Sequence, residues 1–304
     1  MVLKQTQLFP LESSGCVKLP ETGAKKRTSF RGSYSHTKLS VYENCPLCYN
    51  YKYIEKPEHP IPFTSIEAFM GSRVHETLEY LYKQIFHSPE SGSDIHEILC
   101  YYKDAWNKKM SDDVKVVKEG MTALDYFEQG EKILKDYFEL HAPFSEDRTL
   151  FETDNFNKEK PFLEKRVDIV IDGYKLMGFV DRIAEKEDGT ILIHDYKTSG
   201  TLPAVDTLKN DRQLALYRIA LDEKYPDAPK ELVYHYLKFN QDFYIMRSDE
   251  EIEQLKKDVV ALIRKIEKAT EEKNFPAVVT SRCAWCEFAT ICPAKVKKDA
   301  EGQS

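Results

Sequence analysis

Two aspartates and a lysine lie in a Val- and Ile-rich stretch, at a spacing that suits phosphate chemistry. In TILIHDYK (190–197) alternate side chains share one face of an extended strand, so Asp195 and Lys197 end a face begun by two isoleucines. Ionic groups there are costly unless they lie at an edge or bind something. Asp181, in the preceding strand-like run GFVDRI, supplies a second carboxylate.

The turn between these two runs decides whether the carboxylates meet. If residues 187–189 form a three-residue hairpin loop that ends in a left-handed glycine, Lys186 pairs with Thr190 and Asp181 falls opposite Asp195. A two-residue Asp-Gly turn would slip the register by one and separate them. Because like charges directly across two strands repel, the three-residue register requires a cation between them.

Carboxylate oxygens and water are the ligands that Mg²⁺ and Mn²⁺ prefer. Such an ion activates a water molecule, polarises a phosphoryl oxygen and stabilises the leaving oxygen. Lys197 projects to the same side, where it can steady the water or neutralise charge on the phosphate. It can accept a proton only if its pKa is lowered. By itself the Asp-x-Lys triplet is also compatible with a solvated strand end that carries a surface ion pair.

Residues elsewhere in the chain favour the catalytic interpretation. Gln213 and Tyr217 lie four apart, on one face of a predicted helix at 206–223. His75 follows Gly71 by four residues in an apolar helical stretch. A single histidine on such a face is more often a core residue than a ligand, so His75 alone decides nothing.

The order of these motifs resembles that of the RecB-type nucleases of the PD-(D/E)XK superfamily, a family that includes the iron–sulfur exonucleases of CRISPR adaptation. The resemblance covers about residues 40–293. Four motifs carry it: Gly71-x-x-x-His75, GFVDRI, HDYKTS and Gln213-x-x-x-Tyr217. It implies an α/β fold with a restriction-endonuclease-like mixed sheet flanked by helices.

The same resemblance implies roles for individual residues. The metal ligands would be His75, Asp181 and Asp195, assisted by the carbonyl of Tyr196. Lys197 would be the catalytic lysine. The residues that orient it and the DNA would be Gln213 and Tyr217. Glu164 lies where many members carry an acidic residue, and the sequence assigns it no role.

The seven cysteines suggest a second centre, because an odd number in a cytoplasmic chain argues against a disulfide framework. Three of them are closely spaced near the C-terminus: Cys283, Cys286 and Cys292. Cys45 or Cys48 can complete four thiolates, which bind either zinc or an iron–sulfur cluster. The resemblance implies a [4Fe–4S] cluster that joins region 275–293 to Cys45, the cysteine directly before Pro46, with Cys48 as a spare or core residue.

The patterns along the chain predict a flexible arm at 1–35 and one nuclease domain at 36–304, with a helical insertion at about 85–160. The expected elements are helices at 65–87, 206–223 and 249–273, two or more helices within 94–141, a three-stranded meander within 162–197, and strands at 232–239 and 243–247. In the arm, Gln5-Thr6-Gln7-Leu8-Phe9 resembles peptides that dock bacterial repair enzymes on the sliding clamp. The alternative is a chance Leu-Phe pair.

Composition sets limits on function. With 304 residues and a net charge of −7, the chain is not one that coats nucleic acid nonspecifically, and any basic surface must be local. No apolar run approaches the roughly 20 residues that span a bilayer, so a cytoplasmic location is expected.

The sequence therefore predicts a deoxyribonuclease that depends on Mg²⁺ or Mn²⁺. The resemblance implies an exonuclease on single-stranded DNA ends, acting in DNA repair or recombination or in CRISPR adaptation. One alternative is a non-catalytic iron–sulfur DNA-binding or scaffold protein of the same fold. Another is a zinc-stabilised interaction module.

Overall fold

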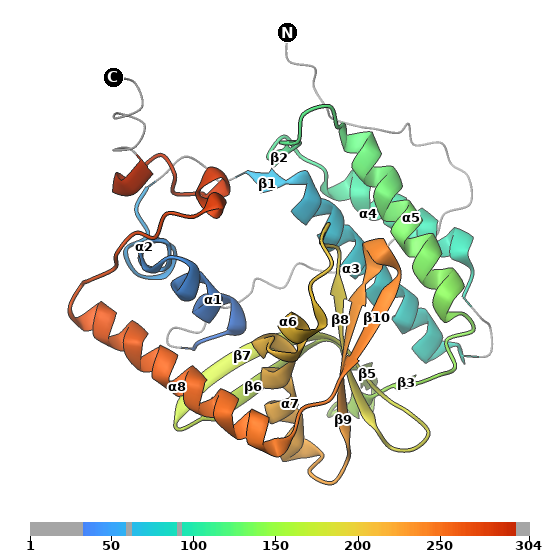
Figure 1. The fold of residues 1–304 in the computed structure, drawn as a ribbon. Coiled ribbons are helices and arrows are strands. Elements are labelled where there is room, and N and C mark those ends of the chain that lie inside the picture. The colour runs from blue at the N-terminus through green and yellow to red at the C-terminus, as the bar shows by residue number, and fades with distance from the viewer. Residues whose placement is uncertain (1–32, 59–62, 90–92, 296–304) are drawn as a thin grey trace. The chain divides into compact units, whose positions relative to one another are not determined.

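The structure, a computed structural model, describes residues 33–58, 63–89 and 93–295 (Figure 1). The chain divides into two compact units. The first, here called the sheet unit, contains Phe63–Val167 and Phe179–Arg247. The second, here called the cysteine unit, contains residues 33–58, Asp168–Gly178 and 248–295. The clamp-like peptide Gln5–Phe9 lies outside the described residues.

A mixed β-sheet forms the centre of the fold, in the strand order β10-β9-β8-β7-β3, with β6 also paired to β7. Its strands are β3 (Arg148–Thr149), β6 (Leu163–Ile171), β7 (Tyr174–Glu185), β8 (Ile191–Lys197), β9 (Lys230–Tyr236) and β10 (Gln241–Ile245). Strands β8 and β9 run parallel, whereas β3–β7, β7–β8 and β9–β10 are antiparallel. The mixed sheet expected from the sequence is confirmed.

The hairpin between β7 and β8 has the three-residue loop. The amide of Lys186 donates to the Thr190 carbonyl at 2.9 Å, and Gly189 has φ +83°. The pairing runs from Glu185–Ile191 to Arg182–His194. Continued by one residue, this register sets Asp181 opposite Asp195, as the three-residue loop predicted.

Three helices of the sheet unit lie side by side in Figure 1: α3 (Ile66–His87), α4 (Ile95–Lys109) and α5 (Ala123–His141). Side-chain caps define where they begin, since Ser65 accepts from the amide of Ala68 and Thr122 forms a capping box with Asp125. Their shared core is aromatic and includes the fully buried Trp106. Helix α5 also covers one face of the sheet, where the rings of Tyr137 and Tyr196 lie 5.6 Å apart.

The helix expected at 206–223 is two helices, α6 (Val205–Lys209) and α7 (Arg212–Lys224). The break has a local cause: Asp211 has an extended backbone, and its side chain caps α7 by accepting from the amide of Gln213 at 2.6 Å. Helix α7 packs on β8 and β9.

The segment expected to be a helical insertion up to about residue 160 is helical only as far as His141. Beyond β3 it forms a hairpin of β4 (Phe151–Thr153) and β5 (Glu159–Pro161). Asp154 closes the hairpin turn by accepting from the amides of Phe156 and Lys158. Turn chemistry therefore sets the structure here. Two short strands pair in parallel: β1 (Thr64–Ser65), which precedes α3, and β2 (Val114–Lys115), which follows α4.

The cysteine unit contains the helices α1 (His36–Asn44), α2 (Pro46–Tyr49), η1 (Asn50–Glu55), α8 (Asp249–Glu271) and η4 (Ser281–Trp285). The arm expected at 1–35 is ordered at its end, because Tyr34 bridges to Leu176 and Ser35 caps α1. Tyr174 donates to Glu267 of α8 at 3.0 Å. Within the part of the chain that the structure describes, every helix is too short or too polar to cross a membrane.

Candidate active site

Three of the predicted catalytic side chains form a closed ring of contacts at the end of β8. Lys197 Nζ lies 2.7 Å from Asp195 Oδ2 and donates to Gln213 Oε1 at 2.9 Å. Gln213 Nε2 donates to Asp195 Oδ1 at 2.7 Å. Asp195 is only 4% exposed. Two strand residues and one helix residue thus hold each other in fixed positions.

Gln213 is itself positioned by its surroundings. The capping residue Asp211 fixes the first turn of α7, and Tyr234 of β9 donates to Asp211 at 3.1 Å. The buried Tyr217, one turn further along α7, hydrogen-bonds to the side chain of Gln213. Sequence reasoning did not single out Asp211, although an aspartate just before a helical run is a typical capping signal.

A second group of candidate ligands lies around Asp181, in the interior of the neighbouring strand β7. His75 Nδ1 is 3.5 Å from Asp181 Oδ2, which also accepts from the amide of Tyr196 at 2.7 Å. Glu164 of β6 joins them, and one ligand atom from each of His75, Glu164 and Asp181 lies within 4.8 Å of the others. Glu164, to which the sequence assigned no role, is thus a third candidate ligand.

The backbone of Glu164 is unusual, with φ +45° inside a strand. A residue with a Cβ atom rarely adopts this region, and such strain concentrates at functional sites. It is consistent with a side chain held toward His75 and Asp181 at some cost in backbone energy.

The structure explains why the Gly71-x-x-x-His75 motif begins with a glycine. A Cβ atom at this position would lie 2.7 Å from Thr198 Oγ1, just beyond β8. The missing side chain therefore lets α3 approach the end of the strand closely, one turn before His75.

Burial and neighbouring charges shift the pKa values of the site. Burial raises the pKa of Asp195, and nearby Asp181 adds to the effect against the opposing influence of Lys197. Burial disfavours the ammonium of Lys197, but Asp195 outweighs it and raises the pKa of that lysine. For His75, burial is outweighed by Asp181, which raises the pKa to about 9. Beside Asp195 the ammonium form of Lys197 is thus favoured over the neutral amine.

The donor atoms fit a divalent cation with a preference for oxygen. Asp195 Oδ2 is buried and accepts no hydrogen bond of good geometry from the described residues, although Lys197 lies beside it. Two carboxylates and an imidazole converge at His75, Glu164 and Asp181, and the charges of Asp181 and His75 act on Asp195. A cation would relieve the repulsion between carboxylates that raises the pKa of Asp195. Of the ligands implied by the resemblance, His75 and Asp181 lie together, and Asp195 is turned toward Lys197 and Gln213.

The cysteine unit brings the two ends of the predicted cluster motif together. Cys48 Sγ lies 3.7 Å from Cys286 Sγ, and Cys45 Sγ accepts from the amide of Val278 at 3.5 Å. Burial, together with Cys286 and Cys45, raises the pKa of the Cys48 thiol to about 12. The described cysteines form no disulfides. Cys48, a spare residue by the resemblance, thus contacts a cysteine of the C-terminal triplet directly, whereas Cys45 contacts Val278.

Comparison with known proteins identifies the class. Residues 33–293 match the sequence model of the PD-(D/E)XK nuclease superfamily, and the chain belongs to this superfamily. No curated protein matches it. Two similar solved structures are a provisionally named exonuclease from Eubacterium rectale and a protein named SSO0001. The first has 13% identity and a TM-score of 0.45 and covers 78% of this chain and 82% of its own. The second has 17% identity and a TM-score of 0.31, with coverages of 85% and 93%.

Proposed function

We propose that this protein hydrolyses DNA phosphodiesters with the help of Mg²⁺ or Mn²⁺ and acts as an exonuclease on single-stranded ends. The observation that carries the proposal is the buried Asp195–Lys197–Gln213 ring beside the converging side chains of His75, Glu164 and Asp181. Membership in a superfamily of nucleases supports DNA as the substrate.

Each side chain has a separable task. The metal ion, when bound, supplies an activated water and polarises the phosphate. The ligands that would hold it are Asp181, His75, Glu164 and the free lone pairs of Asp195. Lys197, kept positive by Asp195, faces the charge that develops on the phosphate. Gln213 keeps both groups in place, so the centre needs little rearrangement during the reaction.

The non-catalytic alternative fits the site less well. Asp195 and most of Lys197 are removed from water, which costs free energy even when the two charges are paired. A scaffold protein gains nothing from burying them next to three further ligands. Charged groups that are buried at a cost in stability and gathered in one place are typical of an active site, so we prefer the interpretation as an enzyme.

The preference for single-stranded ends, and the place of the enzyme in DNA repair, recombination or CRISPR adaptation, rest on the family resemblance. The cluster proposal rests on the same resemblance and on the cysteine geometry. We propose a [4Fe–4S] cluster bound by Cys45, Cys283, Cys286 and Cys292. Cys48 is the rival for the first position, since it lies against Cys286.

The test compares wild type with Lys197→Ala on end-labelled linear strands, circular single strands and duplexes, each with Mg²⁺, Mn²⁺ or EDTA. We expect metal-dependent shortening of linear single strands, reduced about 10²–10³-fold in Lys197→Ala by loss of charge stabilisation. Lys132→Ala, which removes an exposed lysine of α5, is the matched control and should cleave normally. Equal cleavage by wild type and Lys197→Ala would contradict the proposal. Cleavage of circles would replace the exonuclease by an endonuclease.

A further inference from the structure

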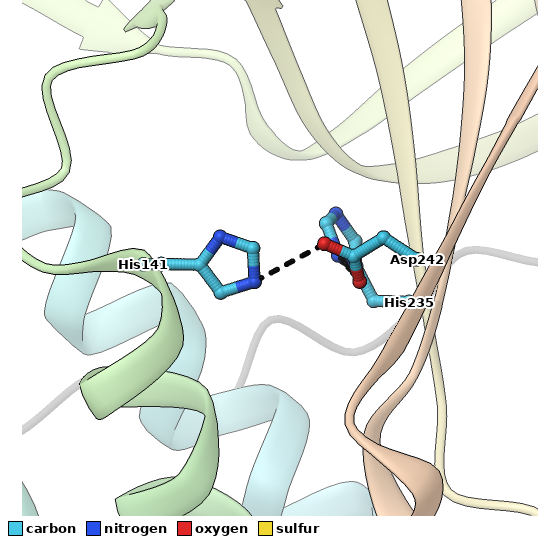
Figure 2. Close-up of side chains that lie close together, drawn as sticks. All are labelled: His141, His235 and Asp242. Carbon is cyan, nitrogen blue, oxygen red and sulfur yellow. Dashed lines mark hydrogen bonds and ion pairs between the residues drawn. The ribbon is translucent and has the colours of Figure 1, made fainter.

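A second cluster of metal-ligating side chains lies in the sheet unit, apart from the nuclease centre (Figure 2). It consists of His141 at the end of α5, His235 of β9 and Asp242 of β10. His141 Nε2 is 3.3 Å from Asp242 Oδ2, and His235 Nδ1 is 2.7 Å from Asp242 Oδ1. In Figure 2 the His141 ring points from its helix toward the two strand residues.

The cluster faces away from the carboxylates of the active site. His235 Nε2 lies 2.8 Å from His194 Nδ1, and His194 pairs across the sheet with Arg182. Arg182 and His194 alternate with Asp181 and Asp195 along their strands, so their side chains leave the opposite face of the sheet. The two sets of ligands therefore belong to different faces.

The ring of His141 does not complete a hydrogen bond to the carboxylate beside it. His141 Nε2 is buried and has no hydrogen-bond partner of good geometry in the described structure, although a carboxylate oxygen lies 3.3 Å away. Two ligands of a tetrahedral ion about 2.0–2.1 Å from the metal lie about this far apart.

A change in the proton positions on the rings of His235 and His194 can free the Nδ1 atom of His235 for a metal. In one arrangement of protons His235 Nδ1–H donates to Asp242, and His194 accepts from Arg182 at 3.0 Å. In the other, His235 Nε2–H donates to His194, and His194 Nε2–H points at Asp147 Oδ2, 3.4 Å away, so that His194 gives up the hydrogen bond from Arg182. No proton leaves the pair of rings. In the second arrangement His235 donates its other ring N–H to an acceptor, His194, as ligating histidines typically do.

Aromatic packing holds the rings in place before any ion binds. The His141 ring lies 4.2 Å from that of Tyr137, and the rings of His141 and His235 are 5.4 Å apart at 80°. The nearby positive charge of Arg182 is paired with Asp147, which accepts from both terminal nitrogens of the guanidinium. Asp242, which contacts both histidines, is thus a carboxylate in position to balance an ion.

Access comes from a cavity of about 450 Å³ lined by residues that include His141, Asp242 and Glu146. It leaves room for water or a further ligand on the open side of the cluster.

We propose that His141 Nε2, His235 Nδ1 and the Asp242 carboxylate bind one late first-row divalent ion, for which Zn²⁺ is the probe. Two imidazoles and one carboxylate suit Zn²⁺, whereas Mg²⁺ prefers oxygen ligands. The ion would pin the edge hairpin of β9 and β10 to the end of α5. Because it would bind only the folded chain, it would act as a structural staple.

Zinc bound per chain is measured after equilibrium dialysis for wild type, His141→Gln, Asp242→Asn and the control His87→Gln, an exposed histidine of α3. We expect His141→Gln and Asp242→Asn each to bind one zinc fewer than wild type and His87→Gln. Asp181→Asn reports on the nuclease centre and should keep the zinc in question. Magnesium should not replace it. Equal zinc in all variants would refute the site.

Crystals of the wild-type chain grown with Zn²⁺ give a test that does not depend on the folding of variants. An anomalous difference peak among the three ligand atoms is expected. Peaks only at the cysteines or at the nuclease centre would overturn the proposal and leave a hydrogen-bonded network. Neither measurement uses nuclease activity, so this inference and the proposed function can fail separately.

Discussion

At the scale of single residues, the role of Lys197 depends on the charge beside it. A lysine near a phosphate site can act as a base only if its pKa falls, and the contact with Asp195 raises it instead. Asp195 in turn shares its other oxygen with Gln213. Because the three side chains depend on each other, substitutions of any two should be non-additive.

The convergence of Glu164 with His75 and Asp181 gives a prediction on metal binding. Glu164→Gln keeps the shape of the side chain but removes a charged ligand. The concentration of Mg²⁺ or Mn²⁺ that gives half-maximal cleavage should therefore rise at least about tenfold. The rate at saturating metal should fall less than in Lys197→Ala. Metal titration of cleavage rates measures both, with Glu159→Gln on the exposed strand β5 as control. An unchanged metal requirement would remove Glu164 from the ligand set.

At the scale of elements, the packing of α4 on α5 depends on one glycine. A Cβ atom on Gly130 would lie 1.9 Å from the hydroxyl oxygen of Tyr102 and 2.6 Å from its ring carbon Cζ. Tyr102 is fully buried and stacks on Phe127, so it has no room to withdraw.

Gly130→Ala should therefore lower the free energy of unfolding by about 1–3 kcal/mol through overpacking. Chemical denaturation measures the change. Gly200→Ala is the control, because a Cβ atom there meets nothing within 4 Å. Adding Tyr102→Phe should restore only part of the stability, since the ring carbon still collides. Full stability in Gly130→Ala alone would contradict this packing.

The buried histidines between the sheet and α5 predict a loss of stability in mild acid. Burial and nearby Arg182 lower the pKa of His194 to about 3, and burial lowers that of His141 to about 4 against the effect of Asp242. Both stay neutral when folded and bind protons when unfolded below about pH 6.5. Stability should therefore fall as the pH drops from 6.5 toward 4, by at most about 1.4 kcal/mol per pH unit for each histidine.

Denaturant unfolding in EDTA at several pH values below 6.5 measures this slope. His194→Gln should flatten it, and His87→Gln should leave it unchanged. His75 changes the stability in the opposite direction. Its raised pKa of about 9 contributes stability that is lost as the pH rises from 6.5 through 9, which is outside the range below pH 6.5 used for this test. A slope that is the same in His194→Gln and wild type would contradict the neutral state of His194.

At the scale of the whole molecule, the chain is two compact units, and the cysteine unit is assembled from three separate segments. Cys45 is in the first of these segments and Cys283 in the last. A cross-link between them closes a loop of most of the chain, which in the chain-entropy model stabilises the fold by about 5 kcal/mol.

Removal of the proposed cluster should therefore lower the melting temperature. Protein purified without oxygen is analysed for iron, sulfide and thermal unfolding as wild type, Cys45→Ser, Cys48→Ser and the control Cys100→Ser from α4. We expect iron and stability to fall in Cys45→Ser and to persist in the other two variants. Loss in Cys48→Ser alone would transfer the fourth ligand to Cys48. Zinc in place of iron would refute the cluster.

The sequence by itself determined what depends on neighbours along the chain. Strand alternation placed Asp195 with Lys197, and the length of the loop that ends at Gly189 was tied to the register of Asp181, because turn geometry fixes pairing locally. The structure decided between the two possible loops in favour of three residues. Only the tertiary structure decided that Glu164 joins His75 and that His141 meets Asp242. These pairs come from elements far apart in sequence, and no local pattern records which faces will pack together.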